Sequence, residues 1–131
     1  MIAMEHLAIL SSKLNLFGKI LSGEKSIESR WYFNRKTPYK NIFPGETIYF
    51  KEGGRFAKAV VEKALFFEVD DARIKELLLE YGDRIGAGIE YFENVKGKRY
   101  VTLVFIRDAA EVKPFYVPFS RAAWITKQRF P

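Results

Sequence analysis

Two cations and a carboxylate lie close together in the first quarter of the sequence: Lys25, Glu28 and Arg30. If this segment is a strand, its two-residue period places Glu28 and Arg30 on one face, opposite Ile27 and Trp31. A guanidinium can bind a phosphate or a base edge through two parallel hydrogen bonds, and a carboxylate can act as a general base. The cluster therefore suits nucleotide binding or hydrolysis. The simpler alternative is a surface ion pair worth about 0–1 kcal/mol.

Three consecutive aromatic residues, Trp31, Tyr32 and Phe33, are followed shortly by Arg35 and Lys36. Bases of single-stranded RNA stack on aromatic rings for about 1–3 kcal/mol each, while Lys and Arg neutralise the phosphates. This run therefore predicts contacts with nucleic acid. The alternative is that the rings fill the core of a barrel.

Two further residues are candidates for nucleic-acid contacts. Lys51 closes a predicted strand, and Trp124 lies among basic residues in the C-terminal tail, where it could equally plug the end of a barrel. The single histidine, His6, is predicted to be structural. The complete set of predicted nucleic-acid-binding residues is Lys25, Glu28, Arg30, Trp31, Arg35, Lys36, Lys51 and Trp124.

These residues must be positioned by secondary structure, whose signals alternate along the whole chain. Strand-like composition marks residues 4–10, 26–33, 47–51, 56–69 and 99–107. Helical spacing with capping residues marks residues 12–22 and 70–82, and a short helix is expected over 89–95. Prolines within residues 112–119 predict an edge strand, and residues 124–131 have no clear pattern.

Strands outnumber helices in this prediction, and hairpins connect those of the second half. This favours an α+β fold: a small mixed β-barrel of five to six strands with two or three helices. A length of 131 residues without a linker or repeat predicts a single domain spanning 1–131.

The composition excludes several functional classes. The absence of cysteine removes disulfides, thiolate metal sites and cysteine nucleophiles, and the presence of a single histidine argues against a histidine-based triad. Asp70 and Asp71 are better explained as helix caps than as metal ligands, so we expect no metal and no cofactor. A net charge of +6 permits a polyanionic partner such as RNA.

The sequence also indicates where in the cell the protein is located. Asn and Gln are scarce while Lys, Arg and Glu are plentiful, a pattern typical of heat-adapted proteins such as those of a thermophilic archaeon. No segment approaches the roughly 20 apolar residues that span a bilayer. Residues 1–10 lack the basic start of a secretory signal. We therefore expect a cytoplasmic protein without a membrane partner.

The pattern Gly-x-Lys-x-x-Glu-x-Arg, formed by Gly23, Lys25, Glu28 and Arg30, resembles the signature of ASCH domains. These domains belong to the PUA-like superfamily of small β-barrels. The order of elements is similar too, because a strand and a helix precede the motif and a Pro-Gly-Glu turn leads into the strand at 47–51. The resemblance covers residues 4–117, and archaeal members of unknown function in particular look similar.

The resemblance implies a PUA-like barrel that works on RNA. Related domains bind RNA, some recognise modified bases, and two branches are reported as enzymes: a ribonuclease and an amidohydrolase acting on acetylated cytidine. The amidohydrolase branch uses a lysine, a threonine three residues later and a glutamate. Lys25 matches that lysine, but Glu28 occupies the position of the threonine and cannot be the same nucleophile.

Three functions remain open from the sequence. The first is an RNA-binding or modified-nucleotide-binding module with Lys25, Glu28, Arg30 and Trp31 lining a cleft. The second is an RNA- or nucleoside-processing hydrolase, ribonuclease or amidohydrolase-like, in which Lys25 and Glu28 are catalytic. The third is a protein-interaction domain. The first two require Lys25, Glu28 and Arg30 to converge on an open cavity of ligand size.

Overall fold

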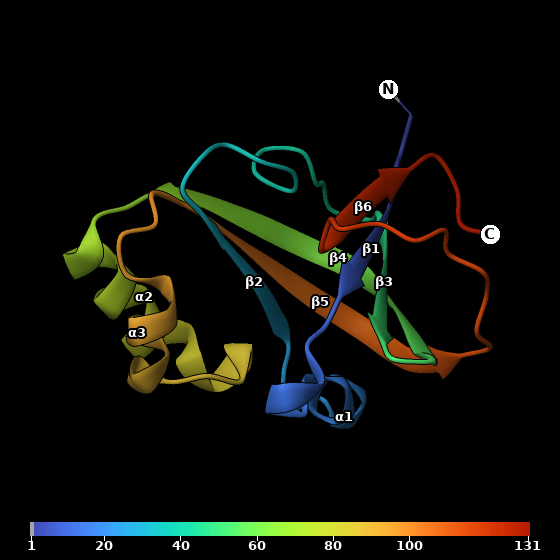
Figure 1. The fold of residues 1–131 in the computed structure, drawn as a ribbon, viewed down its shortest axis with the longest axis horizontal. Helices are drawn as coiled ribbons and strands as arrows, with labels where there is room; N and C mark the ends of the chain where they lie inside the picture. The colour runs from blue at the N-terminus through green and yellow to red at the C-terminus, as the bar shows by residue number, and fades with distance from the viewer. Residues whose placement is uncertain (1) are drawn as a thin grey trace.

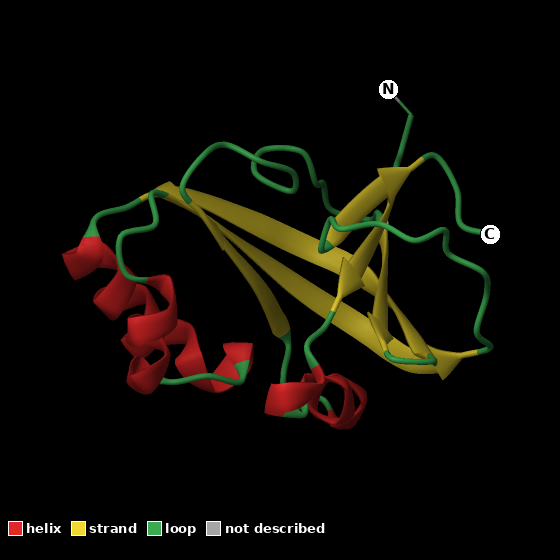
Figure 2. Ribbon diagram, in the orientation of Figure 1, coloured by secondary structure: helices red, strands yellow, loops and turns green. Residues whose placement is uncertain are grey.

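The computed structural model describes residues 2–131, which form one curled six-stranded sheet with helices beside it (Figures 1 and 2). The strands are β1 (Glu5–Ile9), β2 (Ile27–Tyr32), β3 (Thr47–Glu52), β4 (Arg55–Glu68), β5 (Tyr100–Val112) and β6 (Trp124–Lys127). The helices are α1 (Leu16–Ser22), α2 (Asp71–Ile85) and α3 (Phe92–Val95), with 3-10 turns at Ser12–Leu14 and Ile89–Tyr91. The predicted small α+β fold is confirmed, with six strands in one barrel-like sheet and three helices.

The sheet has the order β2-β5-β4-β3-β1-β6, with β1 and β3 parallel and every other pair antiparallel. The long strands β4 and β5 cross the whole molecule and carry register shifts between Lys58 and Val60 and between Val61 and Lys63 (Figure 1). Such bulges bend a strand and increase its twist. The bent sheet forms a half-barrel that leaves β2 at one edge and β6, next to β1, at the other.

Apolar side chains pack on both faces of the sheet. One cluster, which includes Phe17, Phe50 and Val104, fills the inside of the curl beside α1. A second cluster, which includes Trp31 and Leu103, lies between the sheet and helices α2 and α3. The strand predicted for residues 99–107 is thereby confirmed, and neighbouring residues of β5 enter opposite clusters. Among residues 2–131, no helix combines the length and apolarity needed to span a membrane.

Three predicted elements are corrected. The helix expected over residues 12–22 is broken at Asn15, whose backbone is left-handed with φ 52°. Helix α2 runs past Gly82 to a cap at Gly86, where φ is 89°. Gly82 lies inside the helix, and the position requires glycine because a Cβ there would lie 2.8 Å from the Ala87 carbonyl oxygen.

The third correction concerns the C-terminal part of the chain. The edge strand expected over residues 112–119 is absent, since β5 continues to Val112 and the proline-containing stretch that follows has no regular structure. Phe115 instead packs its ring against Tyr49 and Phe56. The tail supplies β6, which pairs with the otherwise open edge of β1.

The β6 strand covers a buried polar group on β1. His6 is fully buried, and its Nε2 lies 2.8 Å from Glu46 Oε1. The indole N–H of Trp124 donates to His6 Nδ1 at 3.2 Å, which assigns the imidazole proton to Nε2. His6 is therefore a neutral structural residue that joins β1, β6 and the turn before β3.

Burial lowers the pKa of His6 below 6.5, although Glu46 opposes this. Below pH 6.5 the unfolded chain therefore binds a proton that the folded protein excludes. We expect the contribution of His6 to the free energy of unfolding to be fully present above pH 6.5. As the pH decreases, the free energy of unfolding should fall by up to about 1.4 kcal/mol per pH unit, until the pKa of His6 in the folded protein is reached. Because His6 is the only histidine, its NMR titration gives the pKa directly, and a pKa above 6.5 would contradict this expectation.

Candidate functional site

Lys25 lies at the junction of three elements and is only 1% exposed. Its ammonium donates to the carbonyl oxygens of Ile27 and Ile85, both at 2.6 Å, and lies 3.1 Å from Glu28 Oε1. An ammonium has three hydrogens, so all of its donors are engaged. The Ile85 carbonyl belongs to the C-terminal end of α2, where a positive charge is favourable. Lys25 thus joins the end of α2 to the start of β2.

Glu28 is buried between two cations. Its Oε1 faces Lys25, and its Oε2 accepts a hydrogen bond from Arg30 Nη2 at 2.6 Å. Burial by itself would raise the pKa of Glu28, but Lys25 and Arg30 outweigh it and hold this pKa below 4.5. Burial also lowers the pKa of Lys25, against the attraction of Glu28. Glu28 is therefore ionised at neutral pH, with both oxygens occupied.

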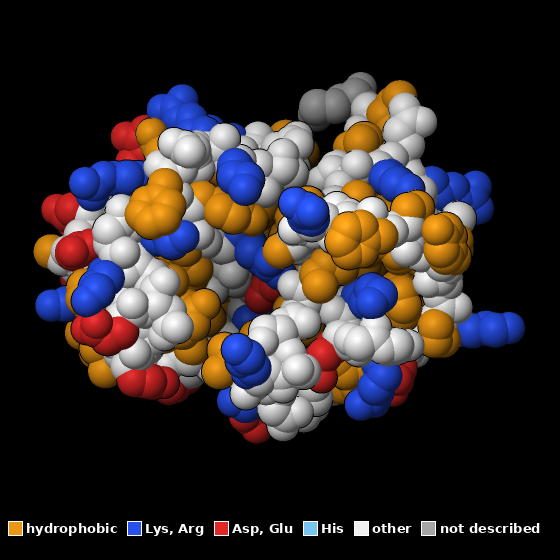
Figure 3. Space-filling view, in the orientation of Figure 1, with side chains coloured by type: hydrophobic (Ala, Val, Ile, Leu, Met, Phe, Trp, Pro, Cys, Tyr) orange, Lys and Arg blue, Asp and Glu red, His pale blue; other side chains and the backbone are white. Residues whose placement is uncertain are grey.

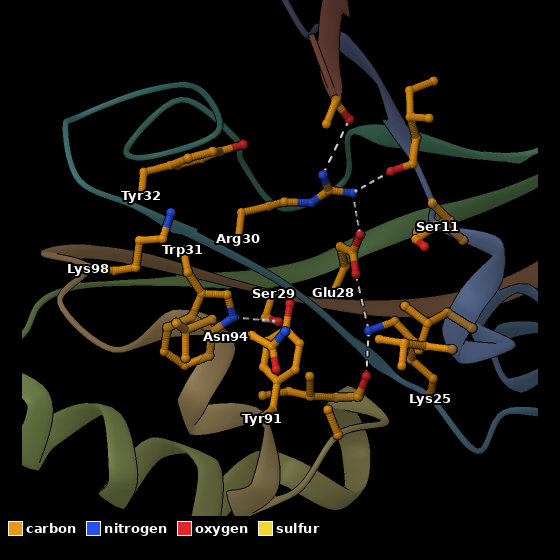
Figure 4. Close-up of a pocket in the computed structure, with 18 residues that line it drawn as sticks. Ser11, Lys25, Glu28, Ser29, Arg30, Trp31, Tyr32, Tyr91, Asn94 and Lys98 are labelled. Carbon is orange, nitrogen blue, oxygen red and sulfur yellow. Dashed lines mark hydrogen bonds and ion pairs between the residues drawn. The ribbon is translucent and has the colours of Figure 1, made fainter. Parts of the chain in front are cut away.

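Arg30 spans the gap between the two edges of the half-barrel. It donates to the carbonyl oxygens of Ile9 at 3.2 Å and Ala123 at 3.3 Å, and its guanidinium lies 5.2 Å from the ring centre of Trp124. With the bond to Glu28, three of its five N–H hydrogens are bonded within the protein, and the hydroxyl of Tyr32 also interacts with the guanidinium. The chain of contacts from Lys25 through Glu28 to Arg30 appears in Figure 4.

A cleft of about 320 Å³ lies against this charged group. Figure 3 shows it as a hollow with acidic and basic side chains at its bottom. Three cations and one carboxylate line it, so its walls carry two excess positive charges. Such a volume is typical of small-molecule sites. The lining polar and aromatic side chains labelled in Figure 4 are Ser11, Lys25, Glu28, Ser29, Arg30, Trp31, Tyr32, Tyr91, Asn94 and Lys98.

The structure brings together four of the eight residues predicted to bind nucleic acid: Lys25, Glu28, Arg30 and Trp31 all line the cleft. Trp31 is largely buried, and its indole N–H donates to Ser29 Oγ at 2.9 Å. The predicted convergence of the carboxylate and the two cations on a cavity is therefore observed.

The other four predicted residues lie outside the cleft lining. Arg35 and Lys36 are exposed on the loop after β2. Lys51 lies on β3, where its ammonium donates to the Gly53 carbonyl at 2.7 Å. Trp124 is buried on β6, and its ring lies against Arg30.

The lining residues that the sequence prediction missed include Tyr91, Asn94 and Lys98. They come from the segment between α2 and β5, whose glycines interrupt any helical or strand periodicity of its apolar residues. Its mixture of aromatic and amide side chains between Gly88 and Gly97 is a signal that could have indicated a binding loop. Among residues 2–131, no three His, Asp or Glu side chains are grouped closely enough to hold a metal ion.

Comparison with known proteins identifies the fold. No family model matches the sequence, and no curated protein is similar to it in sequence. The structure is similar to the crystal structure of an ASCH protein from Zymomonas mobilis, with a TM-score of 0.63 and 18% identity over 84% of this chain and 71% of that one. The chain has the ASCH fold. A point variant of the Zymomonas mobilis protein gives a TM-score of 0.64 at 18% identity, over 85% of this chain and 72% of that one.

The ASCH fold explains the spacing of the motif residues in this chain. Gly23 ends α1 with φ 82°, a conformation that favours glycine. The turn then directs Lys25 inward before β2 begins. Glu28 and Arg30 follow on one face of β2, and Glu28 is three residues from Lys25, so each of its oxygens meets one cation. The resemblance based on the motif is thereby confirmed at the level of the fold.

Proposed function

We propose that this protein binds RNA, or a modified nucleotide, in the cleft beside β2. The observation that carries the proposal is the combination of aromatic walls with two excess positive charges in one cavity of about 320 Å³. A nucleotide has the complementary chemistry, because it joins a flat aromatic base to an anionic phosphate.

Each side chain of the cleft has a distinct part in this proposal. Arg30 lines the cleft and offers its guanidinium to a phosphate or a base edge, and Lys98 adds a second positive charge. Tyr91 provides an aromatic face, and the exposed amide of Asn94 can donate to and accept from a base edge. Glu28 and Lys25 are positioning residues, since they orient Arg30 and do not offer free groups.

The same contacts favour binding over hydrolysis. A general base needs a free lone pair and a pKa near the working pH. Both oxygens of Glu28 are engaged by cations, and its pKa is held below 4.5. The ammonium of Lys25 has no hydrogen left for a substrate. If wild-type protein cuts RNA or deacylates a nucleoside and the Glu28→Gln variant does not, the function is hydrolysis and the binding proposal is wrong.

Replacing Tyr91 with leucine tests the binding proposal, because it removes a flat ring while keeping an apolar side chain. We expect affinity for a labelled single-stranded RNA, measured by fluorescence anisotropy, to fall about 5- to 100-fold. For wild-type protein, log affinity should fall with log salt at a slope near −0.7 per phosphate contacted.

The matched control is Tyr116→Leu, which removes a tyrosine that is 86% exposed and lies outside the cleft. Equal affinities of the two variants would contradict the proposal, as would the absence of RNA binding at low salt. A protein partner that survives nuclease treatment in a pulldown would favour an interaction domain instead.

A further inference from the structure

An exposed aromatic ring lies immediately beyond the cleft. Phe33 follows the last residue of β2 and is 59% exposed. The ammonium of Lys98 lies 4.1 Å from the centre of its ring. An ammonium at this distance interacts favourably with the ring face, so the ring has a defined neighbour although it is outside both sheet cores.

The cations of the loop after β2 and of the segment before β5 differ in whether a carboxylate neutralises them. Arg35 pairs with Glu68 at 2.8 Å, and Lys96 pairs with Glu93 at 2.7 Å. Within the described part of the chain, neither Lys36 nor Lys98 has a carboxylate within ion-pair distance. One positive charge without an ion-pair partner, that of Lys98, therefore lies beside the Phe33 ring, and a second, that of Lys36, lies beside the ring of the preceding residue, Tyr32.

Phe33, Lys36 and Lys98 form an outer group that is continuous with the cleft. Lys98 lines the cleft and also contacts Phe33, while Tyr32 lines the cleft and lies 5.3 Å from the ammonium of Lys36. In Figure 4, Tyr32 and Lys98 lie at the end of the group opposite Lys25. Basic and hydrophobic side chains also alternate along the rim of the hollow in Figure 3. Rings and cations therefore follow one another from the cleft to Phe33.

We infer that the ligand is a single-stranded RNA and not a free nucleotide, and that Phe33, Lys36 and Lys98 form a second nucleotide-binding position. One base occupies the cleft, the phosphate that follows meets Lys36 and Lys98, and the next base stacks on Phe33. The alternation of rings and cations matches the alternation of bases and phosphates in a strand. This inference rests on the proposed function and adds to it the class of ligand.

The test measures affinity for adenosine monophosphate and for oligoadenylates of two, four and eight nucleotides. For wild-type protein, we expect affinity to rise when the second nucleotide is added. Phe33→Leu should remove most of that rise and weaken binding of the eight-nucleotide RNA about 5- to 100-fold, while leaving the mononucleotide unaffected. Lys36→Gln should reduce the salt slope by about 0.7.

The controls are Phe119→Leu, at a ring that is 90% exposed elsewhere, and Lys113→Gln on another exposed lysine. If Phe33→Leu behaves like Phe119→Leu while Tyr91→Leu still weakens binding, the second position is wrong and the proposed function stands. If Tyr91→Leu is also without effect, both are wrong. An equal loss for the mononucleotide and the eight-nucleotide RNA in Phe33→Leu would assign Phe33 to the cleft itself and overturn the inference.

Discussion

Replacing Lys25 with methionine is expected to lower the free energy of unfolding by about 3–5 kcal/mol, since it removes one partner from a buried ion pair. Methionine keeps the apolar stem but leaves the Ile27 and Ile85 carbonyl oxygens without their donor. It also leaves the buried carboxylate of Glu28 with Arg30 as its only cation. Urea denaturation followed by circular dichroism measures the loss as a shift of the midpoint.

Two further variants make this prediction specific. Lys13→Met removes an exposed lysine side chain and should change stability by less than about 0.5 kcal/mol. Adding Glu28→Gln to Lys25→Met removes the negative charge that Lys25 had balanced, so the double variant should recover part of the loss. If Lys25→Met is as stable as Lys13→Met, then Lys25 is not structural and its ammonium is free to face a ligand.

Replacing Arg30 with leucine should have the largest effect on RNA binding. Hydrogen bonds to charged groups contribute about 1.5–3 kcal/mol, so affinity should fall about 10- to 150-fold. The salt slope should also decrease by about 0.7 for each phosphate contact that is lost. Arg30→Lys keeps the charge but not the planar pair of donors, and its affinity should lie between those of the leucine variant and wild type.

The matched control is Arg55→Leu, which makes the same change in net charge at an exposed arginine paired with Glu111. Equal losses in the Arg30 and Arg55 variants would mean that affinity depends on overall charge alone, which would contradict a site at Arg30. Because Arg30 also bridges Ile9 and Ala123, binding should be measured well below the melting temperature of each variant.

Local interactions account for what the sequence correctly predicted about the fold. The helix cap at Gly23, the cap of α2 by Asp70 and the turn ending at Glu46 each depend on residues a few positions apart. The same is true of the face shared by Glu28 and Arg30, which follows from the two-residue period of a strand. Such features are set by backbone geometry and short-range hydrogen bonds, so they can be derived without the rest of the chain.

The tail shows where this reasoning fails. Trp124 has no strand pattern around it, yet it begins β6, because β1 presents backbone groups at an open edge that need partners. The buried imidazole of His6 then accepts the indole hydrogen bond. The unpaired backbone groups of β1 and the acceptor nitrogen of His6 cannot be recognised from the tail sequence, since both belong to residues more than a hundred positions earlier.

The sequence alone thus determined the chemical groups of the candidate site, their spacing and the face of β2 on which two of them lie. Tertiary structure alone decided that the ammonium of Lys25 donates to the carbonyl oxygen of Ile85, 60 residues away, and pairs with Glu28. It also decided that Tyr91, Asn94 and Lys98 complete the cleft. The physical reason is that a cleft is the space left where distant segments pack. Its shape depends on the packing of whole elements, whereas the period of a strand depends only on its own backbone.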